Sequence, residues 1–127
     1  MPLQISNFLS SADIVLDLRA PDKTALLRDL SRRAAGAVPI SAEAIYLELA
    51  KREQLGSTGI GEGIAIPHAR FAELKAPFGI VARLKPPIEY DAIDEQQVDL
   101  VFVILVPATS EKEHLNALAA VARKLRD

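Results

Sequence analysis

The segment from Val98 to Val106, which reads Val-Asp-Leu-Val-Phe-Val-Ile-Leu-Val, limits the possible folds of this chain more than any other feature. Its length suits one strand, and Pro107 ends it. Because nearly every residue is apolar, both faces of such a strand must be covered by other parts of the protein. The segment therefore predicts a central strand of a sheet that is buried on its two faces.

Two helices are predicted in the first half of the chain, each with its own start and stop signals. The first is expected to run from about Asp22, which can cap it, to Ala35, and Gly36 suits its end. The second is expected to begin after Ser41 and to reach Gln54 or Leu55. Apolar residues recur at helical spacing in both and are expected to face the core: Leu26, Leu27, Leu30 and Ala34, then Ile45 and Leu49.

Further segments complete an alternation of strands and helices. Ile14 to Leu18 and Phe78 to Leu84 are β-prone, and Pro86-Pro87 is expected to break the second of these. A late helix is expected from Ser110, because Ser110 and Glu113 fit a capping box. The predicted fold class is therefore α/β, with a mixed central β-sheet and helices packed on both of its faces. The length of 127 residues suits one domain.

Charge and composition argue against several classes of function. The formal net charge is -2, with 15 basic and 17 acidic residues, so no nucleic acid is expected as a partner. The sequence has no cysteine, which excludes disulfides and thiolate nucleophiles and fits a cytoplasmic protein. The N-terminus lacks a secretory signal, and no apolar run approaches the roughly 20 residues of a membrane span. Membrane insertion is therefore not expected.

A glycine-rich loop and two histidines are the features that could carry chemistry. Ser57 to Pro67 reads Ser-Thr-Gly-Ile-Gly-Glu-Gly-Ile-Ala-Ile-Pro, and its glycines permit a tight turn or a close approach. It matches neither the dinucleotide fingerprint nor a P-loop. His68 follows at the end of this apolar segment, and ligands bind α/β sheets at the carboxyl ends of strands. His114 lies in the first turn of the late helix, where the helix dipole favours a neutral imidazole and attracts anions.

Three chemistries could use these residues. In the first, an imidazole attacks phosphorus to give a phosphohistidine, and His68, His114 and Arg52 could supply the nucleophile, its neighbour and a cation. In the second, both histidines bind zinc with a carboxylate, although no short metal motif relates them. In the third, a histidine acts as general base for a serine such as Ser57, although no Gly-x-Ser-x-Gly elbow is present. Taken singly, either histidine is more often structural, and Arg52 more often reaches water past the core edge.

The stretch from Arg52 to His68 resembles the phosphorylation-site signature of the enzyme IIA (EIIA) domains of the bacterial phosphotransferase system, fructose/mannitol type. That group includes nitrogen-related regulatory proteins. Tyr90 to Asp94, Val98 to Phe102 and the surroundings of His114 add to a likeness that covers nearly the whole chain. The resemblance implies a single EIIA domain over residues 1–127. Members of the family usually continue further, so we expect its C-terminal part to be trimmed.

The resemblance also assigns roles to the candidate site residues. It implies that His68 accepts a phosphoryl group from a phosphohistidine carrier protein and forms a tele-phosphohistidine intermediate. It implies a supporting role for His114 and a phosphate-facing position for Arg52, which replaces the expectation that Arg52 merely reaches water. An arginine suits that position because its planar fork can pair with two phosphate oxygens. Neither a cofactor nor a metal ion is implied.

The ending Val-Ala-Arg-Lys-Leu-Arg and the stretch before Phe102 favour the nitrogen-related branch of that family. Such a protein is a phosphorylation-dependent regulator in the cytoplasm. It is fed by an HPr-like carrier of the nitrogen system and acts on targets such as kinases or ion transporters. The alternative left open is a sugar-transport EIIA, of the fructose/mannitol type, that passes its phosphate to a IIB domain.

Overall fold

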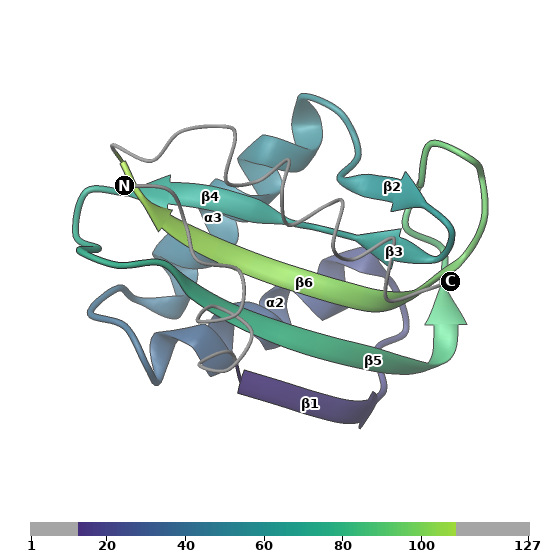
Figure 1. Ribbon diagram of the computed structural model, residues 1–127, viewed down its shortest axis with the longest axis horizontal. Helices are drawn as coiled ribbons and strands as arrows, with labels where there is room; N and C mark the ends of the chain where they lie inside the picture. Colours follow the sequence, from purple (N-terminus) through teal and green to yellow (C-terminus); the bar gives the residue numbers. More distant parts are fainter. Residues whose placement is uncertain (1–12, 109–127) are drawn as a thin grey trace.

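Six strands and two helices make up the part of the chain that is described in this computed structural model, residues 13–108 (Figure 1). Their labels follow Figure 1. In chain order they are β1 (Asp13–Leu18), α2 (Lys23–Ala35), α3 (Ala42–Gln54), β2 (Gly59–Gly61), β3 (Ile64–Ala65), β4 (His68–Phe71), β5 (Phe78–Ile88) and β6 (Val98–Pro107).

The six strands form one mixed sheet in which β6 is central. The order is β1-β5-β6-β3-β2, and β4 also pairs with β6. Strand β6 runs antiparallel to β5 and parallel to both β3 and β4. Its residues from Val101 to Val106 are almost completely buried. The predicted central strand, buried on both faces, is therefore confirmed, although Pro107 is its last residue and not the residue that follows it.

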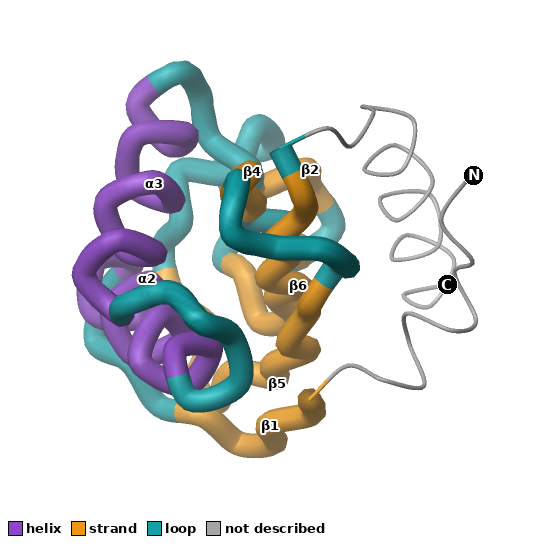
Figure 2. The backbone as a smooth tube through the Cα atoms, turned by 90° about the vertical axis from the view of Figure 1, so that its left-hand side faces the viewer, coloured by secondary structure: helices purple, strands orange, loops and turns teal. Residues whose placement is uncertain are grey.

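Helices α2 and α3 lie side by side on one face of the sheet (Figure 2). The side chain of Asp22 caps α2 by accepting from Ala25 N at 2.8 Å, and Ser41 caps α3 by accepting from Ala44 N at 3.1 Å. The predicted helices and their caps are thus confirmed. The predicted core residues are also buried: Leu26, Leu27, Leu30, Ala34, Ile45 and Leu49.

The mixed α/β fold predicted from the sequence is confirmed. Both described helices cover the same face of the sheet, and the late helix expected from Ser110 lies outside the described residues. A helix on the second face therefore stays a prediction. Neither described helix is long and apolar enough to cross a membrane.

Strand β5 corrects one expectation. The prolines at 86 and 87 were expected to break this strand, but it continues through them to Ile88, which pairs with Val98. The register shifts between Arg83 and Ile88, so the two prolines fall in an irregular stretch of the ladder. A proline is tolerated there because its missing N–H is not needed for pairing.

A second correction concerns the place of His68. The sequence suggested the end of an apolar strand, but His68 is the first residue of β4. Strands β3 and β4 pair with the same side of β6, with Ala65 opposite Val101 and His68 opposite Ile104. Only residues 66 and 67 separate them, and Pro67 still accepts a hydrogen bond from Ile104 N at 3.0 Å. His68 therefore lies at a short interruption of what is otherwise one continuous edge along β6.

Candidate functional site

The side chain of His68 is half-buried on the side of β4 opposite the helices. Ala69 and Phe71 are buried in the core together with residues of α2 and α3. Side chains alternate between the two faces of a strand. His68 and Arg70 therefore point the other way, and Arg70 is exposed. The strand thus holds the imidazole near the surface, while the buried side chains of Ala69 and Phe71 anchor its backbone to the core.

Both ring nitrogens of His68 have partners, and these define the tautomer. Nδ1 lies 2.8 Å from the carbonyl oxygen of Ile66. A carbonyl can only accept, so Nδ1 carries the proton and donates it. Nε2 is then the unprotonated nitrogen, and its lone pair accepts a hydrogen bond from Nε of Arg52 at 3.3 Å. The arrangement leaves Nε2 as the ring nitrogen that could act as a nucleophile.

Arg52 reaches His68 from the last turn of α3. It continues the helix stripe that contains the buried Ile45 and Leu49, but its own side chain is only half-buried. Its Nη1 donates to the carbonyl of Gly56 at 2.8 Å, so the guanidinium bridges the end of α3 and the imidazole. The structure therefore brings Arg52 and His68 together, and the first reading of Arg52, as a side chain that only reaches water, does not describe it.

Burial lowers the pKa of His68 below its usual value. The hydrogen bond to Ile66 opposes this shift, and the charges of Arg52 and Arg70 lower the pKa further, while Glu53 raises it. A lowered pKa keeps the imidazole neutral at pH 7, which an attacking nitrogen requires. The lowered pKa and the proton on Nδ1 therefore both favour an imidazole whose Nε2 can attack phosphorus.

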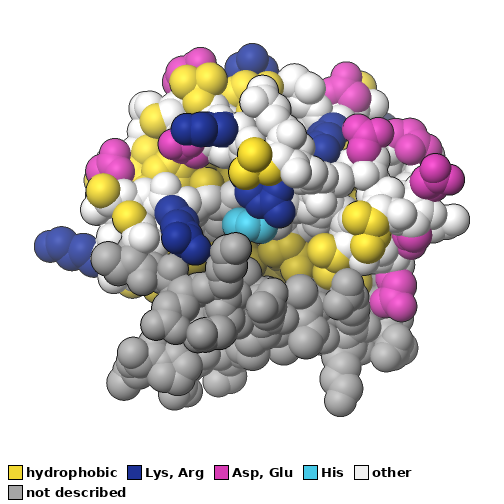
Figure 3. All heavy atoms as spheres, turned by 90° about the horizontal axis from the view of Figure 1, so that it is seen from above, with side chains coloured by type: hydrophobic (Ala, Val, Ile, Leu, Met, Phe, Trp, Pro, Cys, Tyr) yellow, Lys and Arg dark blue, Asp and Glu magenta, His cyan; other side chains and the backbone are white. Residues whose placement is uncertain are grey.

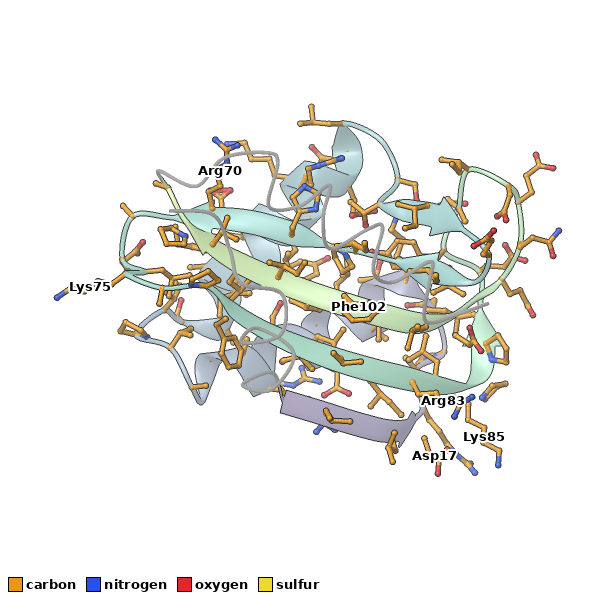
Figure 4. The ribbon with its side chains drawn as sticks, in the orientation of Figure 1. Asp17, Arg70, Lys75, Arg83, Lys85 and Phe102 are labelled. Carbon is orange, nitrogen blue, oxygen red and sulfur yellow. The ribbon has the colours of Figure 1, made fainter. Side chains whose placement is uncertain are left out.

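Basic side chains lie around the histidine, and most, though not all, of the acidic side chains in the same view lie toward its right-hand side (Figure 3). Arg70 extends from β4 at the edge of the sheet nearest this site (Figure 4). Cationic groups beside a half-buried imidazole suit an anionic reactant such as a phosphoryl group.

Ser57 does not form the serine–histidine pair of the third chemistry. Its hydroxyl donates to the carbonyl of Tyr90 at 3.2 Å and accepts from Gly59 N at 3.0 Å. The nitrogens of His68 are engaged by Ile66 and Arg52 instead. Ser57 therefore shapes the glycine-rich loop, which folds back as the antiparallel pair of β2 and β3.

Two further points bear on the predicted site. His114 lies outside the described residues, so its proposed place beside His68 stays a prediction. Within residues 13–108, no group of three or more His, Asp or Glu side chains could hold a metal ion.

Sequence reasoning missed a buried polar group next to the site, made of Glu53, Thr58 and Tyr90. Its signal was weak, because a glutamate in a helix and a threonine in a loop are usually exposed.

Comparison with known proteins gives consistent likenesses. Residues 7–127 match the family model of the phosphoenolpyruvate-dependent sugar phosphotransferase system, EIIA 2. The nitrogen regulatory proteins of Klebsiella oxytoca and Escherichia coli are 42% and 40% identical, with 98% of this chain and 78% and 77% of theirs covered. The crystal structure of nitrogen regulatory protein IIA-Ntr from Neisseria meningitidis superposes with a TM-score of 0.81 at 36% identity, covering 97% of this chain and 84% of that one.

The fold, together with these likenesses, defines a phosphotransferase component of the EIIA class. The chain belongs to the type-2 EIIA family of the phosphoenolpyruvate-dependent sugar phosphotransferase system, and within it to the nitrogen-regulatory branch. The family expected from the stretch Arg52 to His68 is thereby confirmed.

Proposed function

We propose that this protein is a phosphocarrier of the nitrogen-related phosphotransferase system and that it accepts a phosphoryl group on Nε2 of His68. The donor is a phosphohistidine carrier protein. One observation carries the proposal: Nδ1 of His68 is committed to the carbonyl of Ile66 at 2.8 Å, which leaves Nε2 as the unprotonated nitrogen, whose lone pair can attack phosphorus once Arg52 turns away. Phosphorylation at Nε2 gives the tele-phosphohistidine.

The transfer needs no external base. The lone pair of Nε2 attacks the phosphorus of the donor's phosphohistidine, and the N–P bond to the donor breaks as the new one forms. The departing electron pair stays on the donor's imidazole. Nδ1 keeps its proton, and the carbonyl of Ile66 stabilises the positive charge that develops on the ring of His68. Phosphoryl transfer of this kind depends mainly on positioning and on charge stabilisation.

Arg52 is the proposed phosphate-facing cation. In the resting protein its Nε donates to Nε2 of His68, so it must turn from the ring to the incoming phosphate oxygens. Its second bond, from Nη1 to Gly56, keeps the side chain at the site while it turns. His114 is proposed to support the phosphorylated ring from a helix N-terminus, where free N–H groups favour an anion.

Regulation is the proposed purpose of the phosphoryl group. Phosphorylation adds about -1.5 to -2 units of charge, which changes a basic surface into one that repels acidic partners. The proposed targets are proteins such as kinases or ion transporters. The lack of cysteine in the sequence supports placing this function in the cytoplasm. The alternative, transfer of the phosphate to a IIB domain for sugar uptake, has less support, because relatives that are 42% and 40% identical to nearly the whole chain are named as nitrogen regulators.

Phosphorylation in a reconstituted cascade tests the proposal. The protein is incubated with labelled phosphoenolpyruvate, the first enzyme of the cascade and a nitrogen-related carrier, and the label is located by phosphorus NMR. We expect label on Nε2 of His68 in the wild type and none in His68→Ala. Label that survives His68→Ala would exclude His68 as the acceptor. Equal or faster labelling by a sugar-specific carrier, followed by transfer to a IIB domain, would favour the sugar-transport alternative.

The regulatory part needs its own experiment. Proteins captured by wild type, His68→Ala and His68→Asp are compared, because the aspartate places a negative charge at the site. We expect at least one partner to be lost or gained with the aspartate. Identical sets of partners would argue against a switch and leave only the carrier function.

A further inference from the structure

A buried carboxylate, that of Glu53, follows Arg52 on α3 and lies near enough to His68 for its charge to act on the pKa of the imidazole. The side chain of Glu53 is only 7% exposed. Its Oε1 accepts from Nζ of Lys23 at 2.8 Å and from the backbone N of Thr58 at 3.1 Å. Its Oε2 accepts from the hydroxyl of Thr58 at 2.5 Å. Glu53 therefore binds Thr58 twice, once through the backbone and once through the side chain.

The direction of the remaining hydrogen bond follows from the single proton of the Thr58 hydroxyl. That proton is donated to Glu53, so the hydroxyl of Tyr90, 3.1 Å away, donates to Oγ1 of Thr58. Tyr90 is completely buried, and burial together with the charge of Glu53 raises its pKa far above the usual value. The phenol therefore remains a donor. Lys23 completes the group, with Nζ 4.4 Å from the centre of the Tyr90 ring.

This network continues to the imidazole through two backbone hydrogen bonds. The carbonyl of Thr58 accepts from Ile66 N at 2.9 Å, and the carbonyl of Ile66 accepts from Nδ1 of His68 at 2.8 Å. The position of Thr58 thus sets the position of the one acceptor that defines the tautomer of His68. Arg52, the neighbour of Glu53 on α3, holds the same loop at Gly56.

Burying the carboxylate of Glu53 to hold the loop at Thr58 is unfavourable in itself. Taking a charge out of water is unfavourable unless it is paired and fully hydrogen-bonded, and apolar replacements of buried ion pairs are often no less stable. Two of the three contacts described for Glu53 go to Thr58, and the third is the ion pair with Lys23. A group of this kind is better suited to fixing a geometry than to adding stability.

We propose that Glu53 is a positioning residue for phosphoryl transfer at His68, acting through Thr58 and Ile66 to hold the proton on Nδ1 and the lone pair on Nε2. Its effect on the transfer rate rests on the proposed function. Its effect on the tautomer does not, because the tautomer is a property of the unphosphorylated protein.

The test combines a spectroscopic readout with a rate. Nitrogen-15 NMR of the imidazoles, assigned with His68→Ala, reports which ring nitrogen of His68 carries the proton. Wild type and Thr58→Ser, which keeps the hydroxyl, are expected to show Nδ1 protonated. Glu53→Gln and Thr58→Val are expected to show a mixture of tautomers and a phosphoryl-acceptance rate at least about tenfold lower, since small misplacements of reacting groups are costly.

Ser31→Ala serves as the matched control. Ser31 is buried and its hydroxyl donates to the carbonyl of Leu27 at 2.7 Å, so this variant also loses a buried hydroxyl, but in α2. It should lower stability without changing the tautomer of His68. If Glu53→Gln and Thr58→Val keep the wild-type tautomer, or if Ser31→Ala alters it equally, the inference is overturned. If Glu53→Gln does not fold, Thr58→Val decides, because valine preserves the shape of threonine. Failure of the wild type to accept phosphate would contradict the proposed function but leave the tautomer result decisive.

Discussion

Nε of Arg52 donates to Nε2 of His68 across 3.3 Å, so the proposed nucleophilic lone pair is already engaged in the resting protein. The contact is long for a hydrogen bond and is held from the other side by the bond of Arg52 to Gly56. An incoming phosphoryl group must replace Nε of Arg52 at this lone pair. The guanidinium is then adjacent to the group that has displaced it and can bind its oxygens.

Replacing Arg52 by lysine separates charge from geometry. Lysine keeps the positive charge but offers one point of contact where the arginine has three nitrogens in a fixed plane. We expect the rate of phosphoryl acceptance by Arg52→Lys to fall about 100-fold, a typical cost of losing one oriented donor at a reacting centre. Arg32→Lys, in the last turn of α2, is the control and should transfer at the wild-type rate. A wild-type rate in Arg52→Lys would show that charge alone suffices.

The lowered pKa of His68 predicts how stability depends on pH. Burial is its main cause, so the folded chain takes up the proton at a lower pH than the unfolded chain does. At about pH 8, well above the pKa of an unfolded histidine, the ring is neutral in both states, so its protonation does not change the free energy of unfolding. As the pH falls below that value, the unfolded chain binds the proton first. Stability is therefore lost until the pH passes the folded pKa.

Urea unfolding of wild type and His68→Gln between about pH 5 and pH 8 measures this difference. The difference in unfolding free energy between the two proteins should be constant at the upper end and should shift against the wild type toward the lower end. A difference that stays constant throughout would show that the pKa of His68 is not lowered. In the same range, the wild-type rate of phosphoryl acceptance should fall as the ring becomes protonated.

Most of the framework could be predicted because it is governed by local signals. Caps at Asp22 and Ser41, apolar spacing in two helices and one long apolar strand each act over a few residues. The place of His68 could not be derived in this way. Strand β4 is short, and it exists because the central strand β6 offers it a partner, which is a tertiary effect.

The site was predictable in part. Arg52 and His68 were identified from their resemblance to a family signature, and the structure brings them into contact. The carboxylate of Glu53 and the phenol of Tyr90 were not foreseen. They come from positions far apart in the sequence, and both contact the hydroxyl of Thr58 in the folded protein. The spacing of apolar residues along the sequence does not predict a hydrogen-bond network that depends on such packing.

Substitution by alanine is expected to have opposite effects on stability at Gly59 and at Gly36. A Cβ at Gly59 would lie 2.8 Å from both Cα and Cβ of Ala92, so backbone must move to admit it. We expect Gly59→Ala to lower the free energy of unfolding by about 1–3 kcal/mol. Gly36 has a helical φ of -72°, and its nearest contact would be the carbonyl of Arg33 at 3.4 Å. Gly36→Ala should therefore be neutral or should stabilise by about 0.4–1 kcal/mol.

Chemical denaturation of both glycine variants, with the wild type beside them, measures the two effects. Equal stabilities for Gly59→Ala and Gly36→Ala would contradict the close approach between the loop and Ala92.

Two leucines of α3 test whether this helix, which carries Arg52 and Glu53, is held by the core. Leu49 is completely buried, whereas Leu47 is 55% exposed. Leu49→Ala should lower the free energy of unfolding by about 2–5 kcal/mol through lost contacts and a cavity. Leu47→Ala, the same change on the same helix, should stay within about 0.5 kcal/mol. Similar losses for both would mean that α3 does not pack as described.

The interruption between β3 and β4 has a consequence for the motions of the site. Pro67 and His68 on one side and Ile104 on the other belong to the same hydrogen-bonded ladder with the central strand. Amide groups in such a strand exchange with solvent only when a large cooperative unit opens. Strand β4 pairs with β6 alone, so slow exchange is expected only for those amides of β4 that point toward the central strand. A partner that recognises the phosphorylation state therefore meets a backbone anchored by the central strand, on which the phosphate and the side chains around it, such as Arg52, are the groups that change.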